Sequence, residues 1–163
     1  GCFRYRNVTW NTHAIASEVI ARGAAAGDIN QQMFETRSRA QMEAELTILK
    51  TMEFHFNDRC ALIAVTRNIM EQTGLRDEDI DAFVSKPREI EGVLIGLALK
   101  ENEDGGFKIS FRTNPPADAA AIAKHMGGGG HVGAAGCSFR GTLEEARTQV
   151  LAVCKDYLAE LNV

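Results

Sequence analysis

A run of four glycines and a histidine, Gly127-Gly128-Gly129-Gly130-His131, constrains the folding of this chain more than any other segment. Residues 117–126 before it have the composition of a short helix, and Gly127 is a suitable C-terminal stop for that helix. One glycine is enough for a stop, and each further glycine costs about 0.5–1 kcal/mol of chain entropy relative to alanine. The remaining glycines therefore need a second explanation.

Two explanations of the glycine run compete. Backbone amides without side chains can form a cradle for an anion, and the His131 side chain adds a further hydrogen-bond donor. A flexible linker is the alternative, but linkers are flanked by polar, low-complexity sequence. Here a helix precedes the run, and small apolar residues and a strand pattern near 135–140 follow it. The pattern favours a loop that grips a phosphate group, although no Walker-type Gly-Lys-Ser/Thr follows.

Charge and cysteine usage exclude some classes of protein. The 163 residues are 45% hydrophobic and carry a net charge of −4, whereas broad binding to duplex nucleic acid needs a basic excess. The net charge does not exclude binding of a short oligonucleotide in a local site. The four cysteines are scattered without a C-x-x-C pair, which is typical of a reducing cytoplasm. No signal peptide or bilayer-length apolar run is present, so we expect a cytoplasmic protein that does not enter the membrane.

The first third of the chain is predicted to be helical. Asn11 or Thr12 can cap a helix that ends near residue 26, and a second, longer helix is expected over 29–51 with a solvated charged side. Gly1 to Asn7 shows neither an initiator Met nor a targeting pattern, so we expect a fragment of a longer protein.

The rest of the chain alternates between strand and helix patterns. Strands are expected at 52–56 (with His55 on the outer face), 60–65, 93–99, 107–113 and 135–140, and helices at 67–72, 77–83, 117–126 and from Thr142 onward. Thr142 and Glu145 form a capping box. This order predicts an α/β (α+β) fold with a mixed β-sheet flanked by helices.

The strand at 107–113 carries a polar row. Lys108, Ser110 and Arg112 alternate with three apolar side chains. Arginine offers a planar fork that holds a phosphate through two hydrogen bonds, and the serine hydroxyl is a further donor. A solvent face on an edge strand is the alternative. The phosphate interpretation gains support because this strand leads, through one helix, to the glycine run.

Several of these motifs resemble a known family. Ser110-Phe111-Arg112-Thr113, the glycine run with His131, and Ala134-Ala135-Gly136 resemble the DHH-associated domain of the DHH phosphoesterases, of the oligoribonuclease/pAp-phosphatase and cyclic-di-AMP phosphodiesterase type. The segment 87–93 resembles that group's Pro-Arg segment, and Gly1-Cys2-Phe3-Arg4-Tyr5 resembles the end of its Thr-Asp-Thr-Gly-x-Phe-Arg motif. Thr113 stands where the family often has serine.

The resemblance implies that different parts of the chain belong to different domains. Residues 1–29 would be the tail of a catalytic DHH domain, 30–51 a linker helix, and 52–163 the DHH-associated, substrate-binding domain. It implies Mn²⁺ in the full-length protein, with no metal ligand and no catalytic residue in this chain. The substrate-binding roles that it carries over fall on Arg88, Ser110, Arg112, Gly128, Gly129, Gly130 and His131.

The implied function is substrate binding within a manganese-dependent phosphoesterase, inactive as this fragment alone. Short RNA, pAp, a cyclic dinucleotide or polyphosphate remain open as substrates, the missing catalytic domain is the expected partner, and a homodimer stays open. A non-catalytic nucleotide sensor and the exopolyphosphatase or RecJ-type exonuclease branch are the alternatives. Metal-ligand motifs in the preceding sequence would favour an enzyme over a sensor.

Overall fold

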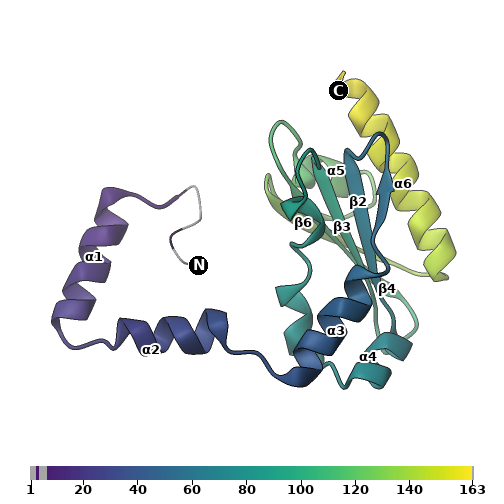
Figure 1. The fold of residues 1–163 in the computed structure, drawn as a ribbon. Coiled ribbons are helices and arrows are strands. Elements are labelled where there is room, and N and C mark those ends of the chain that lie inside the picture. The colour runs from purple at the N-terminus through teal and green to yellow at the C-terminus, as the bar shows by residue number, and fades with distance from the viewer. Residues whose placement is uncertain (1–2, 4–6, 163) are drawn as a thin grey trace. The chain divides into compact units, whose positions relative to one another are not determined.

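The computed structural model describes residues 3 and 7–162, which fall into two compact units, Gly1–Ser38 and Arg39–Val163 (Figure 1). The resemblance at residues 1–5 lies, apart from Phe3, outside the described residues. The boundary at Ser38 falls inside the predicted linker helix. Assignment of residues 1–29 to a catalytic domain stays a prediction.

The first unit contains α1 (Trp10–Ala21), α2 (Ala26–Asn30) and the π-helix η1 (Gln31–Glu35). Capping of α1 by Asn11 or Thr12 was wrong, because the N-cap residue is Thr9. The Thr12 hydroxyl instead accepts a hydrogen bond from the Thr9 amide at 3.1 Å. The helix also ends earlier than residue 26, since Gly23 adopts φ +100° and leaves the helical region.

The single helix predicted over 29–51 is also wrong. Thr36 is extended, with φ −103° and ψ 121°, and its hydroxyl donates to the Gln31 carbonyl at 3.0 Å. This side chain satisfies a carbonyl at the end of the helix, so the helix stops there. A new helix, α3, then runs over Arg39–Leu49.

The second unit holds the rest of the structure, in which helices and 3₁₀ segments alternate with strands. In chain order after α3 its elements are β1 (Glu53–His55), β2 (Cys60–Val65), α4 (Arg67–Thr73), η2 (Asp77–Ala82), η3 (Pro87–Glu89), β3 (Ile95–Glu101), β4 (Phe107–Thr113), α5 (Ala119–Lys124), β5 (Gly129–His131), β6 (Ala134–Phe139) and α6 (Leu143–Glu160).

The described strands form one mixed sheet in the order β1-β2-β3-β4-β6-β5. Only the pairing of β2 with β3 is parallel among these strands, and the other neighbours are antiparallel. The predicted α+β class with a mixed sheet flanked by helices is confirmed. The predicted strand 107–113 has the bounds of β4, whereas β3 begins at Ile95, two residues later than predicted.

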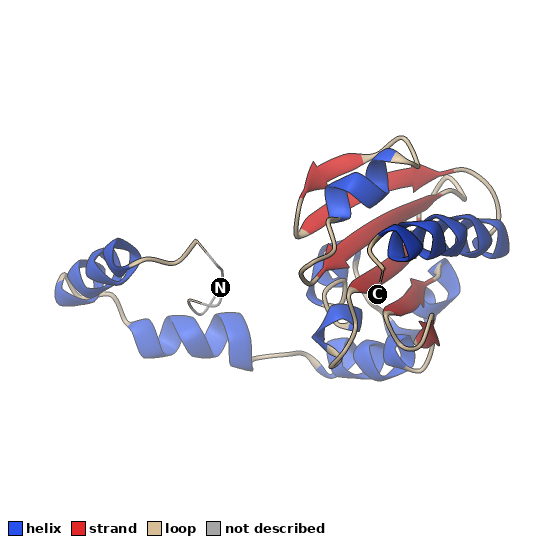
Figure 2. Ribbon diagram, turned by 90° about the horizontal axis from the view of Figure 1, so that it is seen from above, coloured by secondary structure: helices blue, strands red, loops and turns tan. Residues whose placement is uncertain are grey.

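Helices cover the two faces of this sheet unequally (Figure 2). On one face, which we call the α6 face, Leu97, Ile109 and Phe111 pack with residues of α5 and α6. On the opposite, α3 face, Ile63 and Ala98 pack with residues of α3, α4 and η2. This second core involves residues of β2 and β3 but none of β4, β5 or β6, so the helices of the second unit pack mainly on the β2 and β3 part of the α3 face.

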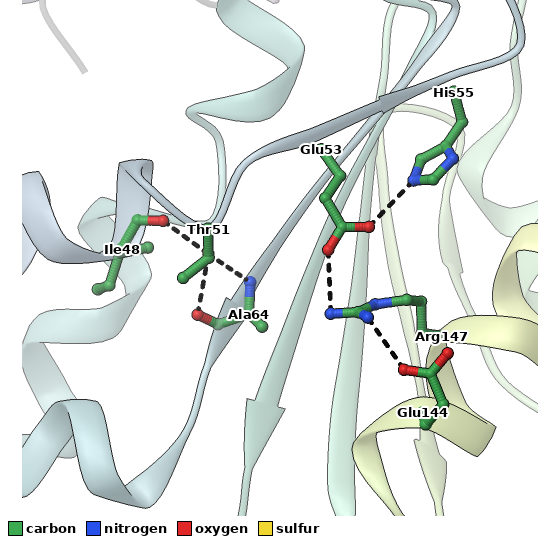
Figure 3. Close-up of polar contacts among 7 residues, drawn as sticks. All are labelled: Ile48, Thr51, Glu53, His55, Ala64, Glu144 and Arg147. Carbon is green, nitrogen blue, oxygen red and sulfur yellow. Dashed lines mark hydrogen bonds and ion pairs between the residues drawn. The ribbon is translucent and has the colours of Figure 1, made fainter.

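Polar contacts at the β1 edge run toward α6 (Figure 3). The Glu53 carboxylate contacts His55 Nε2 at 3.3 Å and Arg147 at 3.0 Å. The predicted outer-face position of His55 is therefore wrong: His55 is partly buried, and Phe54, which points to the opposite face, is 46% exposed. Thr51 joins α3 to β2, since its hydroxyl donates to the Ile48 carbonyl at 2.7 Å and accepts from the Ala64 amide at 3.0 Å.

The predicted capping box of α6 is confirmed and gives a pH-dependent prediction. The Thr142 backbone amide donates to Glu145 Oε2 at 2.8 Å. This bond, followed by that of the Thr142 hydroxyl, lowers the pKa of Glu145. A lowered carboxyl pKa stabilises the fold above the unfolded-state pKa, and the contribution is lost as pH falls through the folded-state value.

We therefore expect Glu145→Gln to lower the melting temperature at pH 7 and to match the wild type once pH falls below the pKa of Glu145. Thermal unfolding of both proteins at several pH values measures this difference. Glu160→Gln, at the other end of α6, is the control, with no such pH-dependent difference. A constant gap between Glu145→Gln and wild type at every pH would contradict the prediction.

No helix in the described part of the chain combines the length and the apolar character that crossing a bilayer requires.

Candidate functional site

The candidate site is built on β4, which lies inside the sheet between β3 and β6. The edge-strand alternative for Ser110 and Arg112 is therefore wrong. Both side chains belong to the α3 face, because Ser110 stands opposite the inward-facing Ala98 and Arg112 opposite Gly96. Ser110 is buried, at 7% exposure, and Arg112 is partly buried, with a guanidinium N–H that donates to the Phe111 carbonyl at 3.0 Å.

The strand register brings most of the predicted site residues onto one surface. Arg112 pairs with Ala134, which pairs with His131, and Ser110 pairs with Gly136, which pairs with Gly129. Directly paired residues point to the same face, and neighbouring strands are about 4.8 Å apart. The backbones of Arg112 and His131 are thus about 10 Å apart across Ala134. We call the α3 face of β4, β6 and β5 at Ser110, Arg112, Gly129 and His131 the open face.

The glycine run forms a helix end and a strand, which corrects the prediction of a loop. Gly127 has φ +71°, and the amides of Gly127 and Gly128 donate to the carbonyls of Lys124 and Ala123 at 3.1 and 2.9 Å. This is the Schellman ending of a helix. Residues Gly129–His131 then pair with β6 as the edge strand β5, so the flexible-linker alternative is wrong.

Packing explains two of the last three glycines of the run but not the third. A β-carbon on Gly128 would lie 2.6 Å from Cys137 Cβ, and one on Gly130 would lie 2.5 Å from Ala135 Cα. Gly130 also has φ +152°. A β-carbon on Gly129 would meet no heavy atom within 4 Å. Of these three glycines, Gly129 is the one whose missing side chain the packing of the protein does not require.

The backbone of Arg88 lies beside the site, next to Gly96 of β3. A β-carbon on Gly96 would lie 2.7 Å from the Arg88 amide nitrogen, so the absence of a side chain at Gly96 lets η3 lie directly on the α3 face beside Arg112. The Asn114 side-chain amide donates to the carbonyls of Arg88 and Val93 at 2.8 and 2.9 Å. Asn114 therefore fixes the segment that carries Arg88.

Thr113 fixes the opposite side of the site. Its hydroxyl donates to the Val132 carbonyl at 2.7 Å, and its amide donates to the Gly133 carbonyl at 3.3 Å. Val132 and Gly133 form the turn between His131 and β6. The two residues after Arg112 thus hold the segments that carry Arg88 and His131. Sequence reasoning missed this role of Thr113 and Asn114, and its only signal was a pair of short polar residues at a strand end.

We expect Asn114→Leu to displace the segment of Arg88 more than it lowers stability elsewhere, because two carbonyls lose their donor while volume is conserved. Two lost hydrogen bonds predict a melting temperature lower by several degrees, at about 1 kcal/mol each and about 2–4 °C per kcal/mol. Hydrogen exchange should speed up at residues 88–94 and not in α6. Uniform faster exchange across the sheet would contradict a local role.

The site offers hydrogen-bond donors to an anion. Burial raises the pKa of the Cys137 thiol behind Gly128, which keeps it protonated. Within the described ranges, no three His, Cys, Asp or Glu side chains are grouped so that they could hold a metal ion. The arrangement of arginine, serine, histidine and a glycine strand is suited to binding a phosphate and positioning it.

The comparisons with known proteins show which domain family the chain matches. Residues 60–160 match the model of the DHHA1 domain. The chain is 31% identical over 159 residues to a bifunctional oligoribonuclease and PAP phosphatase of Thermus thermophilus, covering 97% of this chain and 47% of the relative. It is 27% identical over 139 residues to a probable protein of the same name from Streptococcus mutans, covering 85% of this chain and 44% of the relative.

Two solved structures share the fold. An exopolyphosphatase-related protein from Bacteroides fragilis matches with a TM-score of 0.89 and 26% identity, over 99% of this chain and 47% of that one. A pGpG-specific phosphodiesterase from Vibrio cholerae matches with a TM-score of 0.51 and 13% identity, over 96% and 53%, which shows the fold alone.

The chain thus spans about half the length of the curated relatives that it matches. The matched domain begins at the first residue of β2 and ends with α6, and it contains every residue of the open face. The resemblance drawn from the serine–arginine strand and the glycine run is confirmed. This chain belongs to the DHHA1 domain family, and the curated relatives that it matches are named as bifunctional oligoribonuclease and PAP phosphatases.

Proposed function

We propose that the open face binds a phosphate group of a nucleotide substrate for a phosphoesterase. The observation that carries the proposal is the register that places Arg112, Ser110, Gly129 and His131 on the same face of the sheet. The Arg112 guanidinium can donate charge-assisted hydrogen bonds to a phosphate, and the Ser110 hydroxyl can donate a neutral one. Gly129 lets a ligand approach the strand, since neither packing nor backbone conformation requires a glycine there.

The relatives narrow the substrate class. Two curated relatives are named as oligoribonuclease and PAP phosphatases, so we propose short oligoribonucleotides or pAp, with cyclic dinucleotides as a related possibility. Hydrolysis in this proposal needs Mn²⁺. The described residues do not group into a metal site, so we place manganese and the catalytic residues in a separate catalytic domain of the full-length protein. The part played by this chain is to position the substrate and neutralise its charge.

The test is a titration of the ¹⁵N-labelled 163-residue chain with pAp and with a 5′-phosphorylated dinucleotide. We expect the amide signals of residues 129–131 and of Arg112 to shift, and we expect no hydrolysis by the pure chain when Mn²⁺ is added. Shifts confined to other surfaces would overturn the site. Manganese-dependent turnover by the chain alone would overturn the division between binding and catalysis.

A further inference from the structure

A pocket of about 110 Å³ lies on the α3 face directly beside Ser110. Its sheet side consists of side chains from β2, β3 and β4, including Lys100, Lys108 and Ser110, and its other side belongs to η2 and the residue Val84. Ser110 belongs to both the pocket and the open face. The pocket is therefore the continuation of the phosphate site along β4, away from Arg112.

The lining of the pocket is mixed rather than purely cationic. Ile80, Val84 and Ala98 give it an apolar floor, and each is at most 5% exposed. Two lysines and the carboxylates of Asp77 and Asp81 supply donors and acceptors. Carboxylates repel a second phosphate, whereas an apolar floor with a few polar groups of both kinds is typical of a pocket for an uncharged organic group.

The spacing along β4 fits the parts of one nucleotide. Two residues along a strand advance about 6.8 Å, so Arg112, Ser110 and Lys108 offer three successive positions on the same face. A phosphate at Arg112 places a ribose near the Ser110 hydroxyl and a base in the pocket. The order phosphate, sugar, base then follows the order of the side chains.

The polar groups of the pocket match the edge of a purine. Lys100 Nζ lies 3.0 Å from Asp77 Oδ1, and the Lys100 side chain is 21% exposed. This ion pair presents a donor and an acceptor side by side. Lys108 adds a second donor, and no ion pair joins it to any residue in the described part of the chain. Purines carry ring or carbonyl acceptors next to amino donors.

We propose that this pocket holds the purine base of the nucleotide whose phosphate lies at Arg112. The inference rests on the proposed phosphate site and adds to it a base-recognition compartment formed by β3, β4 and η2. A base pocket of this kind favours binding of a nucleotide over binding of a phosphate chain without a base. Lys108 is a specificity-determining residue in this arrangement, and Ile80 and Val84 contact the flat side of the base.

The test compares guanosine 5′-phosphate with ribose 5-phosphate, by calorimetric titration of the 163-residue chain. One charge-assisted hydrogen bond is worth about tenfold in affinity, so we expect the nucleotide to bind about tenfold more tightly than the sugar phosphate. Lys108→Met should reduce this preference to about twofold and leave the affinity for ribose 5-phosphate unchanged. Lys155→Met, on an exposed position of α6, is the matched control and should change neither.

A second measurement tests the contact itself. With guanosine 5′-phosphate bound, nuclear Overhauser contacts are expected between the base protons and the methyl groups of Ile80 or Val84. Equal binding of nucleotide and sugar phosphate, both dependent on Arg112, would overturn the base pocket and leave the phosphate site intact. Loss of inorganic diphosphate binding in Lys108→Met, with the base preference unchanged, would make the pocket an anion site instead. If neither ligand binds, both proposals fail.

Discussion

Alanine at position 129 is expected to weaken substrate binding at least tenfold, an effect of about 1.4 kcal/mol, without changing the melting temperature. The added methyl group would meet no heavy atom of the protein within 4 Å, so it should not lower the stability of the fold. Gly129 pairs with Gly136 on the open face. The methyl group would therefore project into the space where we place the phosphate.

Alanine at position 128 or 130 should do the opposite. A β-carbon on Gly128 would overlap the Gly136 carbonyl and the Cys137 side chain, and one on Gly130 would lie 2.6 Å from the Ala134 carbonyl oxygen. Overpacking typically costs about 1–3 kcal/mol, and each kcal/mol lowers the melting temperature by about 2–4 °C in a chain of this size. Both variants should melt several degrees lower.

The three alanine variants are measured together, by thermal unfolding and by titration with pAp. Gly133→Ala, in the turn after β5, is the control, because a β-carbon there also meets no heavy atom within 4 Å. It lies outside the proposed phosphate site and should change neither quantity. Full binding by a stable Gly129→Ala would show that this strand is only structural.

The sequence was most informative where a single pattern agreed with the tertiary environment. The alternation of Phe107, Ile109 and Phe111 with polar residues predicts β4 with its observed bounds, because those three side chains are buried on the α6 face. The capping box at Thr142 is equally local and equally well predicted. Local patterns of this kind need no knowledge of distant contacts.

Other elements depend on contacts that the local pattern does not contain. A run of glycines has little tendency to form a strand, and β5 exists because it pairs with β6. The helix expected over 29–51 breaks where one threonine hydroxyl takes over a backbone carbonyl. The orientation of β1 places Glu53 toward α6, where its carboxylate lies 3.0 Å from the Arg147 guanidinium.

The candidate site shows the same division. Ser110, Arg112 and the glycine run were found as motifs, and the register unites them on one face. The roles of Thr113 and Asn114 could not be found in this way, because each contacts a segment 19 to 26 residues away. The pocket beside Ser110 was missed for the same reason, since η2 and β4 form it together.

Replacement of Arg112 by alanine is expected to produce the other large effect. A hydrogen bond to a charged group contributes about 1.5–3 kcal/mol, so the affinity for pAp should fall roughly ten- to a hundredfold. Arg112 is partly buried and its guanidinium donates to the Phe111 carbonyl of its own strand, so the melting temperature of the variant is measured together with its affinity. Lysine should restore part of the loss, since it keeps the charge but lacks the planar fork.

Arg140→Ala is the matched control for this measurement. Arg140 is exposed and follows the end of β6, whereas Ala134, the partner of Arg112, begins that strand. Its loss removes the same charge from the molecule at a distance from the open face, and the affinity for pAp should stay within about twofold of the wild type. If both arginine variants weaken binding equally, the attraction is a general effect of net charge. A selective loss in Arg112→Ala, partly restored by lysine, identifies the guanidinium fork as the group that holds the phosphate.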